Sequence, residues 1–350
     1  MEIQRESIFV SSLRAFFKSL FFVLGLITAL FVASLLFSSI ASPYRQESKT
    51  TMEILPDLNG KREVAPLSAP AILQINVHGV IGDCSNCGPN HITSEFVQNI
   101  LVESREGFLQ HDRVRGILLH FDTPGGSAIE SDNIYRLLLK YKELFKVPVY
   151  GYVNGMCASG GMYIASAADR ILCGPAGIVG SVGVRSGPFF NVYETITKWG
   201  IQSKTITEGL DKDMLNPVRP WKPNEDENLK EVMASLYRQF VNIVTAARPS
   251  LSKEKLVQEY GAKIFDGEVA KEYGYVDEAN TSYEDAILSL MNAANINPEE
   301  PYQIIRLEQK RSLLEGLLTS KSPLITGKMD HHAQLPSESE LGRERIMFLL

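Results

Sequence analysis

The pattern of apolar and polar positions separates an uncharged N-terminal segment from a longer region of alternating apolar runs. Residues 19–41 read SLFFVLGLITALFVASLLFSSIA and carry no charged side chain. At about 1.5 Å per residue, a helix of this length spans the roughly 30 Å hydrocarbon core of a bilayer. The pattern therefore predicts a transmembrane helix over residues 19–41.

Basic residues precede this segment, at Arg5, Arg14 and Lys18. Positive charge is retained on the cytoplasmic side of a membrane, so we expect residues 1–18 to be cytoplasmic and the bulk of the chain extracytoplasmic. A cleaved signal peptide is the alternative, with residues 39–42 (SIAS) as its cleavage site. The apolar run is long for a signal peptide and favours a retained anchor, although both remain open.

Beyond a polar stretch at residues 42–68, which is typical of a linker, strand and helix patterns alternate. The nearly continuous apolar run at 114–121 fits a buried parallel strand and leads through a Gly-rich turn into an amphipathic helix. The same order recurs at 147–153, where a strand pattern runs into Ser159 and then a helix of small residues. This alternation predicts an α/β fold with crossover connections, and we place its domain at residues 69–283.

The remaining elements are expected to be shorter. Asn224 and Glu227 are expected to cap a long amphipathic helix that continues to about residue 244. Beyond residue 298 the pattern weakens, so residues 284–350 are expected to be a C-terminal extension, partly disordered. The terminal residues 346–350 would be a free end or would dock in a neighbouring groove. Further strands are expected at 71–77, 170–173, 178–184, 203–207, 274–277 and 302–306, and helices at 93–108, 190–199, 267–273, 283–295 and 312–318.

Charge and cysteine content exclude some classes of function. The net charge is −6 and the chain has no basic stripe, which argues against a nucleic-acid surface. Cys84 and Cys87 form a CxxC pair that would give a local disulfide outside the cytoplasm or half of a metal site. His91 is close by, but no fourth ligand is evident, so no metal and no cofactor are expected. Cys157 and Cys173 lie among apolar residues and are expected to be buried.

Ser159 is the candidate nucleophile, because it stands at a strand-to-helix turn and precedes two glycines that let a peptide approach the backbone. A plain helix cap would have the same sequence. A serine nucleophile needs a base, yet none of the six histidines stands in a triad motif and Ser159 has no G-x-S-x-G setting. The alternative base is a neutral lysine. Since the reference pKa of lysine is about 10.4, such a base must be desolvated or lie beside positive charge.

Five short motifs then make the chain similar to a known family. They are DTPGG at 122–126, ASGG at 158–161, GSVG at 180–183, GLDKD at 209–213 followed by NP at 216–217, and FDG at 265–267. In this order they resemble the signal peptide peptidase A family of membrane-anchored Ser/Lys proteases, over residues 71–277. The resemblance implies a fold like that of the Clp protease subunit and the crotonases, a superhelix of repeated β-β-α units. The CxxC loop and the tail after residue 298 are not part of the family pattern.

The resemblance also implies residue roles. Ser159 corresponds to the nucleophile, Lys212 to the general base and Ser181 to a serine that orients the lysine, while the amides of Gly126 and Gly160 correspond to the oxyanion hole. Alternatives remain, since Ser181 would also suit a turn, Gly125 would also suit the donor position and Lys204 is the nearest competing base. Asp211 and Asp213 flank Lys212 and would favour its charged form, so we expect them to face away or to pair elsewhere.

The resemblance further implies substrates and partners. Members of the family bind peptides as an added strand, in pockets that suit the apolar residues of remnant signal peptides. This chain carries one copy of the domain, which implies a ring-shaped homo-oligomer with sites near subunit boundaries and the helix after Asn224 as a candidate interface. Two other classes of function stay open, a crotonase-like enzyme acting on acyl thioesters and a non-catalytic membrane scaffold.

Overall fold

The computed structural model describes residues 8–40, 50–82 and 91–309, and it divides the chain into two compact units at residues 49 and 50. The first unit contains the helix α1 (Ile8–Ile40). Within α1, residues Ser12–Val32 have a mean hydropathy of 2.2 and are long enough to cross a membrane. This helix covers most of the predicted transmembrane segment. The CxxC pair, the helix expected at 312–318 and residues 346–350 lie outside the described residues.

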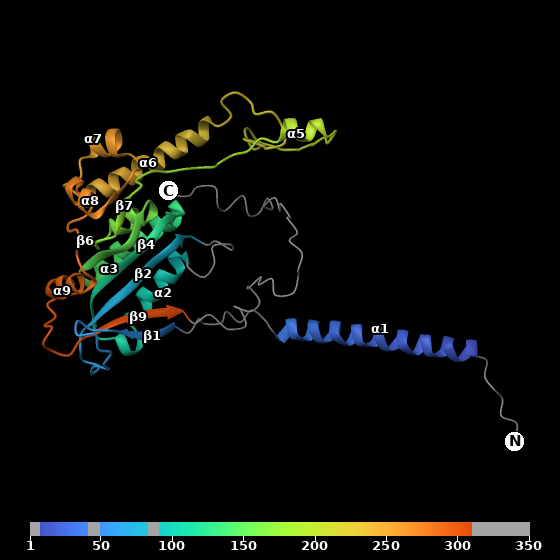
Figure 1. The fold of residues 1–350 in the computed structure, drawn as a ribbon, viewed down its shortest axis with the longest axis horizontal. Coiled ribbons are helices and arrows are strands. Elements are labelled where there is room, and N and C mark those ends of the chain that lie inside the picture. The colour runs from blue at the N-terminus through green and yellow to red at the C-terminus, as the bar shows by residue number, and fades with distance from the viewer. Residues whose placement is uncertain (1–7, 41–49, 83–90, 310–350) are drawn as a thin grey trace, which may run out of the picture. The chain divides into compact units, whose positions relative to one another are not determined.

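The second unit is built on a nine-stranded mixed sheet with the path β1-β9-β2-β4-β5-β7-β8, to which β3 and β6 add on β2 and β5 (Figure 1). The central strands β2, β4, β5 and β7 are parallel. Residues 117–119 of β4 are fully buried, as expected for a parallel strand covered on both faces. The strands are β1 (Thr50–Leu55), β2 (Ala71–Ile81), β3 (His91–Ile92), β4 (Val114–Gly126), β5 (Val149–Ala158), β6 (Arg170–Cys173), β7 (Ile178–Gly180), β8 (Ile264–Asp266) and β9 (Gln303–Gln309).

Helices cover both faces of the sheet and enclose two hydrophobic clusters. The larger cluster joins the sheet to α3, α4 and α6, through residues such as Phe121, Leu138 and Phe240. The smaller cluster packs α9 against the other face, where Leu290 and Ile287 lie with Leu118. The predicted α/β class is thereby confirmed. The helices are α2 (Ser94–Glu103), α3 (Ala128–Phe145), α4 (Gly160–Ala165), α5 (Tyr193–Lys198), α6 (Glu227–Ala247), α7 (Lys253–Lys255), α8 (Gly267–Tyr273) and α9 (Tyr283–Ala293).

Three local expectations were wrong. The strand predicted at 203–207 is unpaired, and that at 274–277 is replaced by a single bridge between Leu172 and Glu278. Both segments have strand-like composition, but 203–207 has no neighbouring strand among the described residues. The segment at 274–277 meets β6 only at its end, where Asp277 N donates to the Ile171 carbonyl at 2.8 Å. The N-cap of α6 is Asp226, without a side-chain cap bond, because Asn224 lies in the left-handed region at φ 60°.

The sheet also includes strands from outside residues 69–283. β1 falls in the range expected to be a linker and β9 in the range expected to be an extension, and the two pair antiparallel while β9 adds parallel to β2. Buried Arg113 secures this edge. Its guanidinium donates from Nε to the Ala69 carbonyl at 2.8 Å and from Nη2 to Gln303 Oε1 at 2.6 Å.

Residues 185–226, here called the arm, leave the sheet after β7 and return to it through α6. Figure 1 shows α5 at the far end of this arm, away from the strands. Apolar side chains of the arm face solvent, since Trp199 is 78% exposed, Ile206 85% and Leu210 95%. The arm therefore has no hydrophobic core of its own within this chain.

Replacing Arg113 should weaken the β9 edge. The substitution Arg113→Met leaves the Ala69 carbonyl and the Gln303 amide oxygen buried without their donor, so we expect the free energy of unfolding to fall by about 2–3 kcal/mol. Equilibrium denaturant unfolding of the full-length chain in detergent measures this change. Arg115→Met is the matched control, because Arg115 is exposed two residues further on. Equal stability of the two variants would contradict the role given to Arg113.

Candidate active site

Ser159 stands at the turn between β5 and α4 in an unusual backbone conformation. Its φ of 53° and ψ of −116° lie in a region that non-glycine residues seldom occupy and that costs about 1–3 kcal/mol. The turn is held because the Ser159 amide donates to the Gly180 carbonyl at 2.9 Å and Tyr163 N donates to the Ser159 carbonyl at 3.1 Å. Strain of this kind concentrates at functional sites.

The Ser159 hydroxyl is buried, and Oγ has no hydrogen-bond partner among the described residues. Although Ser159 occupies the N-cap position of α4, its side chain makes no capping bond. The structure therefore excludes a simple helix-capping role for the Ser159 side chain. A buried hydroxyl without a partner is uncommon in folded proteins and calls for an explanation, of which chemical use is one.

Two glycines of β4 lie directly against this turn. A Cβ on Gly125 would come within 2.8 Å of both Gly160 N and Ser159 Cβ, and one on Gly126 would come within 2.0 Å of the Ile81 carbonyl oxygen. Only glycine allows this approach. The two candidate donors are neighbours, because a Cβ on Gly160 would lie 3.4 Å from Gly126 N. The Gly125 amide is already engaged, as it donates to Thr123 Oγ1 at 3.0 Å.

Ser181 lies beside Ser159 at the end of the next strand. Ala158 and Gly180 are register partners in β5 and β7, so the serines that follow them occupy equivalent positions. Ser181 is 2% exposed, has a φ of 55° and donates its amide to the Lys263 carbonyl at 2.7 Å. The structure thus brings together Ser159, Ser181, Gly126 and Gly160.

Lys212 is placed differently, because it belongs to the arm. Its side chain is exposed and makes no hydrogen bond or ion pair with a described residue. Within one chain, Lys212 is therefore not in hydrogen-bond contact with Ser159 or Ser181. Lys204, the competing base, is also exposed on the arm.

No histidine of the described residues contacts the Ser159 hydroxyl. His78 on β2 and His120 on β4 instead pair with each other, with His78 Nε2 and His120 Nδ1 2.7 Å apart. Burial, followed by the charge of its neighbour His78, lowers the pKa of His120 to about 4, and burial also lowers the pKa of His78. Both rings are accordingly neutral near pH 7 and occupied with each other.

A polar network that the sequence did not predict connects α4 with two neighbouring helices. The Tyr163 hydroxyl donates to Asp132 Oδ1 at 2.7 Å and accepts from Gln239 Nε2 at 2.7 Å, and Arg136 Nε donates to Asp132 Oδ2 at 2.7 Å. The network links α4 to α3 and α6. It joins residues up to 107 positions apart, so no local motif could have indicated it.

Comparisons with known proteins place the chain in a family. The model of peptidase family S49 matches residues 143–297. A putative protease of Methanocaldococcus jannaschii is 40% identical over 190 residues, which are 54% of this chain and 59% of that protein. A putative signal peptide peptidase of Enterococcus faecium is 34% identical over 63% of this chain and 62% of its own length. A putative protease of Synechocystis sp. is 31% identical over 62% of this chain and 76% of its own length.

The chain belongs to peptidase family S49, as its motifs indicated. It spans about three fifths of the length of the archaeal and enterococcal relatives. Among solved structures, a membrane-bound stomatin-specific protease in complex with a substrate peptide is similar at 16% identity and a TM-score of 0.40. That similarity covers 72% of this chain and 96% of that structure.

The Tyr163 hydroxyl should contribute measurably to stability. Tyr163→Phe removes one donor from Asp132 and one acceptor from Gln239, so we expect the free energy of unfolding to fall by about 1–2 kcal/mol. Tyr135→Phe is the control, because Tyr135 packs edge-on against Tyr163 and its hydroxyl makes no hydrogen bond to a described residue. Denaturant unfolding of both full-length variants compares them, and equal losses would argue against the network.

Proposed function

We propose that this chain is a serine endopeptidase in which Ser159 is the nucleophile and a lysine is the general base. The observation that supports this most directly is the buried, unpartnered Ser159 hydroxyl at a strained strand-to-helix turn. In the proposed reaction the base takes the proton of Oγ, and Oγ attacks the scissile carbonyl carbon. The proton then passes to the leaving amine, and water releases the acyl group from Ser159.

The amides of Gly126 and Gly160 are proposed as the oxyanion hole. Gly160 is the first residue of α4, and the first amides of a helix have no partner within it. The engagement of the Gly125 amide with Thr123 favours Gly126 over Gly125 as the second donor. Donors aimed at a developing oxyanion act without reorganisation, and loss of one typically costs about 10²–10³-fold in rate.

Lys212 is proposed as the base, contributed to Ser159 by the arm of a neighbouring copy. Two features support an assembly in which the arm is covered. Lys212 makes no contact with Ser159 in its own chain, and apolar side chains of the arm such as Trp199 and Leu210 are exposed. A contiguous exposed apolar surface commonly marks an interface. Ser181, beside Ser159, is proposed to orient the incoming ammonium group, and the assembly is proposed to be a ring-shaped homo-oligomer.

The proposed substrates are apolar peptides at the outer face of a membrane, among them remnant signal peptides. The apolar helix α1 supports a membrane location, and the basic residues Arg14 and Lys18 near its start support a cytoplasmic N-terminus. The enterococcal relative is named a signal peptide peptidase, which supports the substrate class. Experiment must decide whether peptide hydrolysis requires Ser159 and Lys212.

Substitution of either proposed catalytic residue should abolish hydrolysis of an apolar fluorogenic peptide by the full-length chain in detergent. We expect Ser159→Ala and Lys212→Ala each to lower kcat/KM by about 10⁴-fold or more, since a nucleophile and its base act as a unit. Lys204→Ala is the control and should stay within about threefold of the wild type. Peptide hydrolysis that survives Ser159→Ala would overturn Ser159 as the nucleophile, and survival in both variants would overturn the proposed mechanism.

Mixing the two inactive variants tests whether the base comes from a neighbouring copy. In an oligomer of Ser159→Ala and Lys212→Ala chains co-expressed in equal amounts, about a quarter of the sites would combine an intact serine with an intact lysine. We therefore expect activity to reappear in the mixed oligomer although each variant alone is inactive. Continued inactivity of a mixed oligomer, with mixing verified by two affinity tags, would place both residues in one chain.

A further inference from the structure

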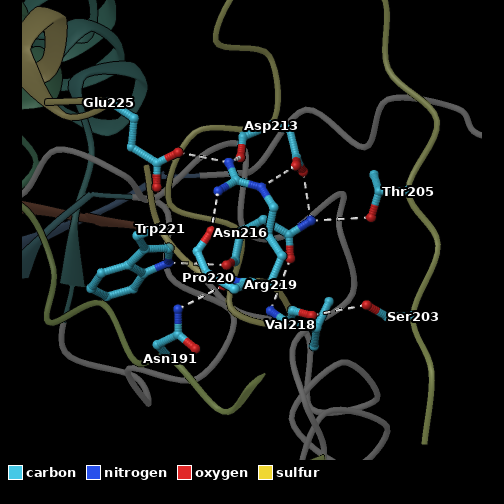
Figure 2. A network of polar contacts seen from close by, with 10 residues as sticks. All are labelled: Asn191, Ser203, Thr205, Asp213, Asn216, Val218, Arg219, Pro220, Trp221 and Glu225. Atoms are coloured by element: carbon cyan, nitrogen blue, oxygen red, sulfur yellow. Dashed lines mark hydrogen bonds and ion pairs between the residues drawn. The ribbon is translucent and has the colours of Figure 1, made fainter. Parts of the chain in front are cut away.

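Arg219 is the centre of a polar network inside the arm (Figure 2). Its Nε donates to Asp213 Oδ2 at 2.5 Å, Nη2 donates to Glu225 Oε2 at 2.7 Å and Nη1 donates to the Pro220 carbonyl at 2.8 Å. Nη2 also bonds the backbone carbonyl of Asp213. One guanidinium thus holds a side chain and a peptide group of the residue that directly follows Lys212.

The carboxylate of Asp213 has both oxygens occupied. Arg219 binds Oδ2, and Asn216 Nδ2 donates to Oδ1 at 2.5 Å. These bonds hold the pKa of Asp213 below its usual value, that from Arg219 first and that from Asn216 second. This pairing confirms the expectation that Asp213 pairs elsewhere rather than with the neighbouring lysine.

Asn216 extends the network to the rest of the arm. Its Nδ2 donates to Thr205 Oγ1 at 3.1 Å, its Oδ1 accepts from Val218 N at 2.9 Å and its carbonyl accepts from Trp221 Nε1 at 3.0 Å. Figure 2 shows Asn216 bonded to Thr205 on one segment of the arm and to Val218 and Trp221 on another. Polar contacts therefore define this part of the arm, which lacks a hydrophobic core.

The turn itself is narrow. Asp211 and Leu215 both lie in the left-handed region, at φ 57° and 55°, and Met214 N donates to the Asp211 carbonyl at 2.9 Å. Lys212 lies between these two residues. The direction of the Lys212 side chain depends on the backbone of the next residue, Asp213. Arg219 fixes that backbone by binding both the carbonyl and the carboxylate of Asp213.

We propose that Arg219 is a positioning residue for Lys212, and that it neutralises Asp213 so that this carboxylate does not stabilise the charged form of the base. The inference rests on the proposed function of Lys212. Arg219 does not touch the reacting atoms and acts only through Asp213. The turn and the segments bonded to it carry the following charged groups: Lys204, Glu208, Asp211, Lys212, Asp213, Arg219, Lys222 and Glu225.

The test compares pH profiles of kcat/KM for full-length variants on an apolar fluorogenic peptide. Arg219→Met leaves an unpaired carboxylate beside Lys212, so the rising limb should move to higher pH by about 0.5–1.5 units while the plateau falls about 10–100-fold. In Arg219→Met with Asp213→Asn the limb should return toward the wild-type position, although the plateau stays low. Arg219→Lys keeps the positive charge but loses the planar guanidinium that binds two acceptors at once. In this variant kcat/KM should rise at the wild-type pH and reach a lower plateau.

Lys230→Met is the matched control, because it removes another cation paired with an aspartate, Asp226, at an exposed site on α6. It should change neither the limb nor the plateau. If kcat/KM rises at the same pH in Arg219→Met and in the double variant, Arg219 does not act by neutralising Asp213. If kcat/KM of Arg219→Met reaches the wild-type plateau, Arg219 does not position Lys212.

A second measurement separates this inference from the proposed function. The two tryptophans of the chain, Trp199 and Trp221, both lie in the arm, so intrinsic fluorescence reports the arm without any activity assay. Arg219→Met should shift this emission, whereas Lys230→Met and Lys212→Ala should not. An active Lys212→Ala variant would refute the proposed base, while an unchanged emission in Arg219→Met would refute the network alone.

Discussion

The hydrogen bond from the Ser159 amide to the Gly180 carbonyl is the constraint on which the candidate site depends. It extends the parallel pairing of β5 with β7 by one residue beyond the register partners Ala158 and Gly180, into a turn whose φ is positive. All six residues of α4 are buried behind this turn, and packing on this scale offsets the local strain. The same strand ends place Ser181 and the glycines of β4 around one buried hydroxyl.

The proposed nucleophile and the proposed base are held in place by different physical means. Ser159 belongs to a packed sheet, where neighbouring backbone and the Tyr163 network leave it little freedom. Lys212 belongs to the arm, whose shape comes from charge-assisted hydrogen bonds around Arg219 rather than from buried apolar area. Polar networks of this kind hold geometry where a core is absent, and they are sensitive to the loss of any one member. The arrangement suits a site completed by association.

The sequence was sufficient for the class of fold, the order of the central strands along the chain and the family, because apolar periodicity and glycine motifs are local signals. It also predicted the pairing of Asp213 away from Lys212. The unpaired strand at 203–207, the docking of β9 and the Tyr163 network depend on contacts between distant residues, which composition does not encode. The placement of Lys212 relative to Ser159 is likewise not encoded in a local motif.

The pairing of β1 with β9 has a consequence for how the domain is made. Thr51 meets Glu308 across a separation of 257 residues, so β1 is synthesised long before its partner β9. Contacts this distant form late, because their loop-closure entropy must first be offset by other structure. Until then β1 and the outer edge of β2 present unpaired backbone groups. The edge formed by β1 and β2 therefore cannot be completed until residues 303–309 have been synthesised.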